Sequence, residues 1–221
     1  TLTVAFTASA PHSGSTCDGA YNGTFKGNLT VSAGQNCIFV GGGVTGNVQQ
    51  NGGNLTLIQS VVGGNLQIGG ASTFNVGPIS TINGNFQIQG LPSGAGQNQV
   101  CGTAVHGNLQ FQNNRTAFLL GSGISACPGN TIGGNLQIQG NSAALQIENN
   151  TINGNLQIQS NSAAAQIESN TVAGNLQVQD NTASIMLFSD HAKGNLQCSG
   201  NSAIIGGGDT AARKQDQCSA F

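Results

Sequence analysis

The chain of 221 residues contains five Lys or Arg and seven Asp or Glu, which gives a formal net charge of −2 at pH 7. This charge excludes the basic surface by which proteins bind nucleic acids or anionic membranes, and no apolar run reaches the ~20 residues of a transmembrane helix. Amides replace charges, with 27 Asn and 22 Gln. Hydrophobic residues make up 37% of the chain and recur regularly, which argues against disorder.

The first seven residues alternate apolar and polar side chains, a pattern typical of a strand. Leu2, Val4 and Phe6 share one face of it, and a linker rich in Pro, Ser and Gly follows. Such a strand either folds back as a cap on its own chain or adds to the sheet edge of a neighbouring copy. We therefore treat residues 1–16 as a separate segment that holds a candidate assembly strand.

One module recurs through residues 17–205, and each copy opens with Gly-Asn and an apolar residue. The copies begin at nine glycines: Gly27, Gly46, Gly64, Gly84, Gly107, Gly134, Gly154, Gly174 and Gly194. The last four stand 20 residues apart, and the two longest intervals hold insertions around residues 91–100 and 116–128. A repeat that covers nearly the whole chain predicts one elongated domain.

Each module alternates like a strand and not like a helix. In one copy Leu136 and Ile138 alternate with glutamines, Leu145 and Ile147 repeat the pattern, and Ile152 marks a third, shorter segment. Gly, Asn-Ser and Asn-Asn pairs between these segments are typical of turns. Three short strands and three corners in 20 residues predict an all-β fold, a single-stranded parallel β-helix of about nine triangular coils.

Stacking explains the many amides. A residue kept at one position of every coil lies ~4.8 Å from its copies in the neighbouring coils, where identical charges repel but amides donate and accept along the stack. The outward glutamines would form a flat face for a polymer with repeating hydroxyl groups, for an identical face of another copy, or simply for water. The candidate interaction surface comprises Gln137, Gln139, Gln157, Gln159, Gln177 and Gln179.

The cysteines fit the same period. Pairing them in order gives separations of 20, 26 and 20 residues, about one coil each, and neighbouring coils lie within disulfide reach. This predicts the bonds Cys17–Cys37, Cys101–Cys127 and Cys198–Cys218. A zinc site is the alternative, but no CxxC motif or His pair accompanies the cysteines, and we expect no metal and no cofactor.

Disulfides at coil spacing predict an oxidising compartment, and hence a secreted or cell-surface protein. No signal peptide is visible, so we expect a mature chain that begins at Thr1. The polar stretch of residues 206–221 is typical of a cap, and with the disulfides of the first and last coils it would protect the solenoid ends from edge-to-edge association.

The modules GNLQIQ and GNLQVQ, and the ending GNLQCSGNSA…KQDQC, resemble a family of secreted bacterial repeat proteins built from GN-[LV]-Q modules. The resemblance spans roughly Cys17 to Cys218 and implies secretion and a repeat fold, without an activity. More distantly, the coil is similar to the right-handed parallel β-helices of the pectate-lyase-like superfamily. That likeness implies a right-handed coil, but the superfold hosts lyases, hydrolases and adhesins alike.

The densest cluster of chemically active side chains is Asp190, His191 and Lys193, where other modules carry Asn and apolar residues. Together they would supply a base and an electrophile for polysaccharide cleavage. The cluster lies next to the last coil, where departures from a repeat also serve as capping. These three residues are the catalytic candidates, beside the structural interpretation as part of the cap.

Two acidic residues, Glu148 and Glu168, stand one period apart and are expected to stack ~5 Å apart on the outside of the coil. Such a pair shares a proton or binds Ca²⁺, or its side chains diverge into water. They are the metal candidates.

Two hypotheses about function follow. The first is a secreted structural or adhesive β-solenoid without catalytic activity, which assembles with copies of itself into fibres. The second is a carbohydrate-active β-helix, either a polysaccharide lyase or a glycan-binding module. The scarcity of basic residues and of Trp and Tyr disfavours the second, because lyases for acidic polysaccharides need a basic cleft and binding modules need aromatic platforms.

Overall fold

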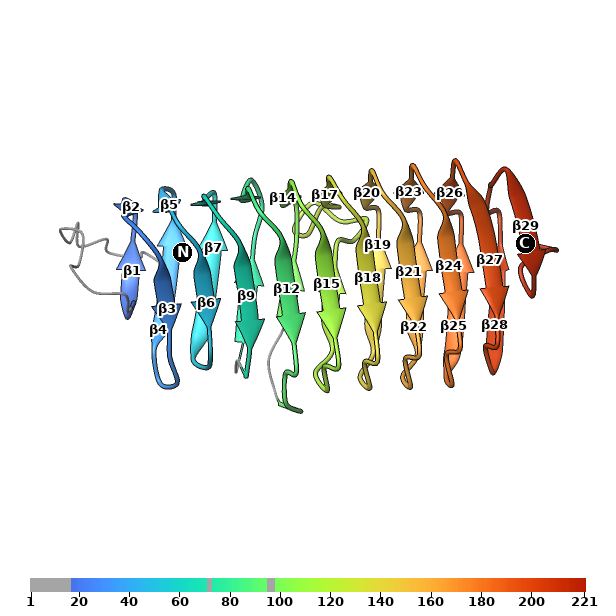
Figure 1. Ribbon diagram of the computed structural model, residues 1–221, viewed down its shortest axis with the longest axis horizontal. Helices are drawn as coiled ribbons and strands as arrows, with labels where there is room; N and C mark the ends of the chain where they lie inside the picture. The colour runs from blue at the N-terminus through green and yellow to red at the C-terminus, as the bar shows by residue number, and fades with distance from the viewer. Residues whose placement is uncertain (1–16, 71–72, 95–97) are drawn as a thin grey trace.

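The computed structural model describes residues 17–70, 73–94 and 98–221. Within these ranges the chain forms strands and no helix. The coils stack one on another along a single long axis from the N-terminal to the C-terminal end (Figure 1). Three parallel sheets of 10, 9 and 10 strands run along that axis, which confirms the all-β parallel solenoid. The candidate assembly strand with Leu2, Val4 and Phe6 lies outside the described residues.

Each coil contributes one strand to each sheet, except that the last coil meets the second sheet only through an isolated bridge between His191 and Thr210. The first sheet contains β1 (Gly19–Tyr21), β4 (Asn36–Val40), β7 (Asn54–Ile58), β10 (Thr73–Val76), β13 (Asn98–Val100), β16 (Phe118–Leu120), β19 (Leu145–Glu148), β22 (Ala165–Glu168), β25 (Ser184–Phe188) and β28 (Ala203–Gly207). The second contains β2 (Thr24–Phe25), β5 (Gly43–Val44), β8 (Val61–Val62), β11 (Thr81–Ile82), β14 (Ala104–Val105), β17 (Thr131–Ile132), β20 (Thr151–Ile152), β23 (Thr171–Val172) and β26 (His191–Ala192). The third contains β3 (Leu29–Val31), β6 (Val48–Gln50), β9 (Leu66–Gly69), β12 (Phe86–Gln89), β15 (Leu109–Gln112), β18 (Leu136–Gln139), β21 (Leu156–Gln159), β24 (Leu176–Gln179), β27 (Asn195–Ser199) and β29 (Arg213–Asp216).

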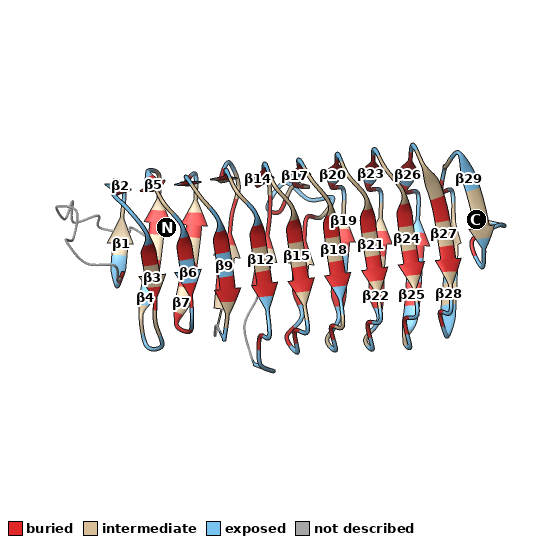
Figure 2. Cartoon of the chain, in the orientation of Figure 1, coloured by how far each residue is buried: buried red, intermediate tan, exposed pale blue. Residues whose placement is uncertain are grey.

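The register places equivalent residues of successive modules side by side. Leu136 pairs with Leu156, and Leu176 with Leu196, so each inward position forms a column of like side chains. Buried and exposed residues alternate along the strands of the third sheet (Figure 2), and these leucines are at most 1% exposed. Burial of one such side chain contributes roughly 1.5–3 kcal/mol. Each coil is narrow and buries few side chains, so the stability of the core comes from the same burial repeated in every coil.

The third sheet contains one strand more than the nine modules predict. Strand β29 pairs with β27 in parallel register, although its sequence lacks the Gly-Asn opening. The C-terminal segment therefore adds one more strand to the solenoid, and only the residues after β29 cap its end. After β29 the chain turns back, and the ring of Phe221 packs where a side chain on Gly206 would lie, which covers the end of the core.

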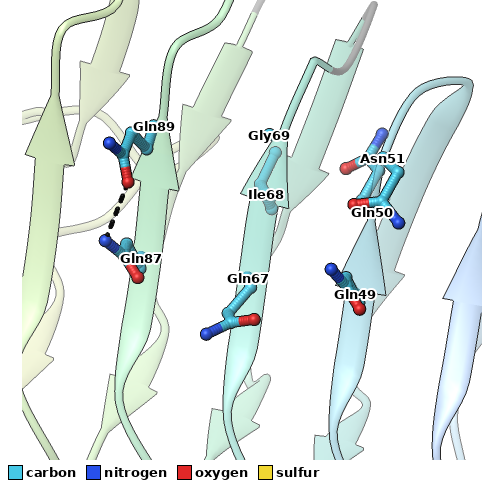
Figure 3. Close-up of a pocket in the computed structure, with 8 residues that line it drawn as sticks. All are labelled: Gln49, Gln50, Asn51, Gln67, Ile68, Gly69, Gln87 and Gln89. Atoms are coloured by element: carbon cyan, nitrogen blue, oxygen red, sulfur yellow. Dashed lines mark hydrogen bonds between the residues drawn. The ribbon is translucent and has the colours of Figure 1, made fainter.

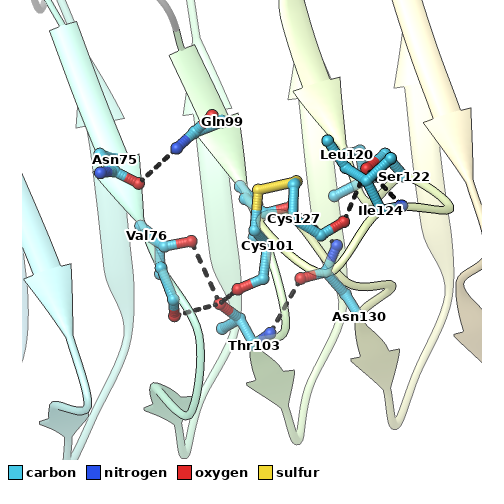
Figure 4. The surroundings of a disulfide bond; sticks show 12 residues. Asn75, Val76, Gln99, Cys101, Thr103, Leu120, Ser122, Ile124, Cys127 and Asn130 are labelled. Carbon is cyan, nitrogen blue, oxygen red and sulfur yellow. Dashed lines mark hydrogen bonds between the residues drawn. A yellow bond between two sulfur atoms is a disulfide. The ribbon is translucent and has the colours of Figure 1, made fainter.

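The three disulfides join Cys17 to Cys37, Cys101 to Cys127 and Cys198 to Cys218, the pairs that the spacing predicts. Their Cα atoms are 5.3, 4.7 and 5.3 Å apart, within the range of roughly 4.4–6.8 Å that a disulfide spans. Figure 4 shows the middle bond, which anchors the loop of the longest interval beside the buried pair Thr103 and Asn130. Three such bonds indicate an oxidising environment.

Candidate functional site

The Gly-Asn pair that opens each module is a structural interlock. Asn155 Oδ1 accepts a hydrogen bond of 2.8 Å from the backbone N–H of Asn175 in the next coil. The same oxygen lies 2.4 Å from where a Cβ atom on Gly174 would stand, and the equivalent distance is 2.4–2.5 Å at every module glycine from Gly46 to Gly194, so these positions leave no room for a side chain. The contact recurs at each junction between modules from Asn28 to Asn195, at 2.8–2.9 Å. The most regular motif of the sequence is therefore used to hold coils together.

A second column of asparagines lies buried at the corner after the third sheet. The preceding corner residue adopts a left-handed conformation, for example Asp180 with φ 55°, which turns the next side chain inward. Each buried Asn donates from Nδ2 to Oδ1 of the next one and to a backbone carbonyl, so its polar atoms are satisfied without water. The column is made of Asn114, Asn141, Asn161, Asn181 and Asn201, and Gln217 ends it.

A third column fills the corner before the second sheet and ends in two carboxyl groups. Asn170 donates from its backbone and from Nδ2 to Asp190 Oδ1, at 2.8 and 2.9 Å, and the Asp190 N–H donates to Asp209 Oδ1 at 2.8 Å. Both acids are at most 2% exposed, and no described residue makes a hydrogen bond with the Oδ2 atom of either. Burial raises the pKa of Asp190 to about 7 and also raises the pKa of Asp209.

The structure does not bring the catalytic candidates together. Asp190 points into the buried column, whereas His191 and Lys193 are exposed on the other side of the strand. His191 Nδ1 makes a hydrogen bond with the hydroxyl of Thr210 in the last coil. Because consecutive strand residues face opposite sides, the three side chains form no common site. In this structure Asp190 occupies the place of an Asn in the corner column.

The metal candidates do lie side by side. Glu148 of β19 pairs in register with Glu168 of β22, and both side chains are half-buried. Burial and the charge of Glu168 raise the pKa of Glu148, and Gln166 Nε2 donates to Glu168 at 3.0 Å. In the described part of the chain, no three His, Cys, Asp or Glu side chains gather in a way that would hold a metal ion.

The outward glutamines of the third sheet divide into two regions. From β15 to β29 each Gln of the first outward column donates from Nε2 to Oε1 of the next, at 2.6–3.0 Å. The paired column consists of Gln110, Gln137, Gln157, Gln177, Gln197 and Gln215. In the second outward column Gln159 donates to Gln179 at 2.8 Å. Much of the candidate interaction surface is therefore already hydrogen-bonded to itself.

The same sheet is hollowed over its first four strands, β3, β6, β9 and β12. Two adjoining hollows of about 320 and 290 Å³ share Gln49 and Gln67 as lining residues. Figure 3 shows the larger one, with the side chains of Gln49, Gln67, Gln87 and Gln89 along its floor. We call the two together the amide groove; the smaller hollow adds Asn28, Leu29, Thr30, Asn47, Val48 and Asn65.

Sequence reasoning missed the amide groove, although the sequence contains a signal for it. In the second outward column, Gly69 pairs in register with Gln89, and the column continues as Gln112 and Gln139. The absence of a side chain at Gly69 leaves the surface open beside Gln89. The change from Gln89 to Gly69 at this end of the column is the sequence signal for the hollow.

No protein-family model, curated protein or solved structure matches this chain. The resemblance to secreted GN-[LV]-Q repeat proteins therefore stays a prediction, whereas the parallel β-solenoid of about ten turns is a property of the structure. None of the described segments forms a helix that would span a membrane.

Proposed function

We propose that this chain is an extracellular structural and adhesive β-solenoid, a stiff rod that acts through the surfaces it presents. The observation that carries the proposal is the set of amide columns, which tie every coil to the next one. Side chains held in such columns are hard to displace, because moving one breaks hydrogen bonds on both of its sides. The three disulfides support the same role, since they favour an oxidising environment outside the cell.

Features of the C-terminal end support self-association. Within the described ranges, strand β28 is the last of its sheet and pairs only with β25, and a strand with one free edge is a template for another chain. Beside that edge, Met186, Phe188 and Ile205 are 37%, 36% and 57% exposed, and Met186 pairs in register with Ile205. An apolar patch beside a free strand edge suits contact with a second copy.

Electron microscopy and light scattering test the assembly. We expect the wild type to form elongated assemblies, and Ile205→Lys to shorten them because it places a charge in the patch. Ser162→Lys adds the same charge in the middle of the rod and is the matched control. Removal of residues 1–7 tests the donated strand. A monodisperse monomer at high concentration, unchanged by the truncation, would contradict self-assembly.

The amide groove favours a second candidate function, the binding or cleavage of a carbohydrate. Its hollows offer polar groups in a row, as a chain of hydroxyl groups requires. Incubation with uronate-containing polysaccharides, followed by the ultraviolet absorbance of unsaturated products, tests for lyase activity. An absorbance rise would favour an enzyme over a scaffold, and its loss in His191→Ala or Lys193→Ala would locate the activity near β26 and not in the amide groove.

A further inference from the structure

In the first outward column, the amides of the groove differ from those of the later coils in not being hydrogen-bonded from one coil to the next. Among the described residues Gln49 and Gln67 have no hydrogen-bond partner for their side chains, and Gln87 donates to Gln89 within its own strand at 3.1 Å. The side chains of Gln49 and Gln67 are exposed, whereas Gln157 and Gln177, which occupy the same position in later coils and are hydrogen-bonded, are half-buried. A ligand over the groove would thus find groups that no neighbouring coil has already satisfied.

The larger hollow of the groove is open because residue 69 is a glycine. Gly69 occupies the outward position at the end of β9, directly after the buried Ile68 and beside Gln89 of the next coil. Its backbone does not adopt a positive φ, and a Cβ atom there would meet only the Gln89 carbonyl oxygen, at an ordinary 3.4 Å. The position therefore tolerates a side chain, and a larger residue would fill the hollow without strain.

The lining specifies the chemistry of the occupant. It contains amides, small residues and aliphatic side chains, and none of its residues is charged. Each side-chain amide both donates and accepts, which matches hydroxyl groups that do the same. An ionic ligand would lose hydration without gaining an opposite charge, so an uncharged ligand is favoured. Equivalent amides recur every coil, ~4.8 Å apart, which suits a polymer of repeating units.

A buried amide lies on the inner side of β6, beneath the larger hollow. Gln50 takes an inward position that pairs with Ile68, and it is 0% exposed. Its Nε2 donates to the carbonyls of Gly53 and Thr73 at 3.0 Å, while its Oε1 has no partner among the described residues. A buried oxygen without a donor is costly, but this one lies on the inner side of β6, so a ligand over the groove would contact the outward amides of Gln49 and Gln67 and not Gln50.

We infer that the amide groove binds one strand of an uncharged, hydroxyl-rich polysaccharide, laid across β3, β6, β9 and β12. The inference rests on the adhesive role proposed above and gives that role a location and a ligand class. The groove has no aromatic platform among its lining residues, so binding is weak per sugar and gains strength from several sugars in a row.

Biolayer interferometry on the immobilised full chain tests this with dextran, galactomannan and hydroxyethyl cellulose as neutral probes, and with polygalacturonate and dextran sulfate as charged ones. We expect the wild type to bind at least one neutral probe and neither charged one. Gly69→Gln fills the hollow, and Gln67→Ala removes a free amide. Each is expected to weaken binding at least about fivefold, the factor for one net hydrogen bond.

Matched controls lie on the paired half of the same face. Ser199→Gln adds a glutamine to the second outward column far from the groove, and Gln157→Ala removes a paired amide; both are expected to bind like the wild type. Thermal unfolding checks that every variant is folded. Binding to charged probes alone, or equal binding by wild type and Gly69→Gln, would overturn the inference.

The two proposals fail in different ways. A chain that self-associates but binds none of the neutral probes overturns the groove and leaves the structural role in place. A chain that binds a neutral probe through the groove but stays monomeric overturns self-assembly and leaves the glycan site in place.

Discussion

The Oδ1 atom of Asn135 lies 2.5 Å from the point that a Cβ atom on Gly154 would occupy. That distance is well inside a normal van der Waals contact, so glycine at 154 is a condition for Asn135 to reach across. The benefit is the hydrogen bond of 2.8 Å from the Asn155 N–H to the same oxygen. Two residues one coil apart are thus mutually dependent.

Gly154→Ala is expected to lower the free energy of unfolding by roughly 1–3 kcal/mol, as overpacking does. In the double variant with Asn135→Ala the added methyl group no longer meets Oδ1 but still meets the Gly134 carbonyl oxygen at 2.7 Å, so the two losses are expected to add only in part. Urea unfolding measures both. Gly207→Ala is the control, because nothing lies within 4 Å of its Cβ. A Gly154→Ala protein as stable as wild type would contradict the interlock.

Asn161→Ala is expected to be among the most destabilising single changes in the chain. It removes the oxygen that accepts from the backbone N–H and Nδ2 of Asn141, and each buried donor left unpaired costs ~1–3 kcal/mol. Ser162→Ala, at the exposed neighbouring position, is expected to stay within ~0.5 kcal/mol. Similar unfolding midpoints for the two variants would show that the buried column contributes little.

Stability is expected to fall with rising pH because of Asp190. Burial raises its pKa from 3.8 to about 7 in the folded state, so between these values the folded chain binds more protons than the unfolded one. The free energy of unfolding therefore decreases as pH rises from about 4 to about 7, by ~1.4 kcal/mol for each pKa unit. Asp209 and Glu168 carry the charges that oppose ionisation of Asp190.

Asp190→Asn tests this directly, since it supplies an Nδ2 donor where the unpartnered Oδ2 now lies. The variant is expected to be more stable than wild type at pH 8 and to lose much of the slope between about pH 4 and about pH 7. Asp209, whose pKa is also raised, would retain a smaller slope. A wild-type unfolding midpoint that does not change over this range would refute the assignment.

Replacement of Cys198 and Cys218 by Ser is expected to loosen the last coil. A disulfide that closes a loop of about one coil contributes ~3 kcal/mol in the chain-entropy model, and a solenoid unravels from its ends. Hydrogen exchange should rise in β27–β29 while β18–β21 stay protected, and light scattering should show more aggregation. A variant without the Cys101–Cys127 disulfide is the comparison, and its hydrogen exchange in β27–β29 is expected to match that of the wild type. An equal rise in β27–β29 in both variants would contradict a local effect of the Cys198–Cys218 disulfide.

The period of 20 residues predicted the three strands, their parallel order and the disulfides, because each depends only on which residues stack. The same period places Asp190 one coil after the buried Asn170, and this stacking explains why Asp190 is buried. The adjacent residues His191 and Lys193 had suggested a catalytic cluster instead. The paired and unpaired halves of the glutamine face were not predictable, since Gln67 and Gln157 occupy the same position of the module. Their pairing depends on side-chain conformation and on neighbours such as Gly69.

Successive Gly-Asn interlocks are separated by as few as 18 and as many as 27 residues, yet each one restarts its coil at the same place. The register between coils is therefore set by the Gly-Asn contact and not by a fixed number of residues per coil. An insertion between two of these contacts, such as the loop closed by Cys101 and Cys127, enlarges one coil without displacing the next. The length of the rod and the outline of each turn can then vary independently during evolution, and foreign peptides can be grafted at the corners.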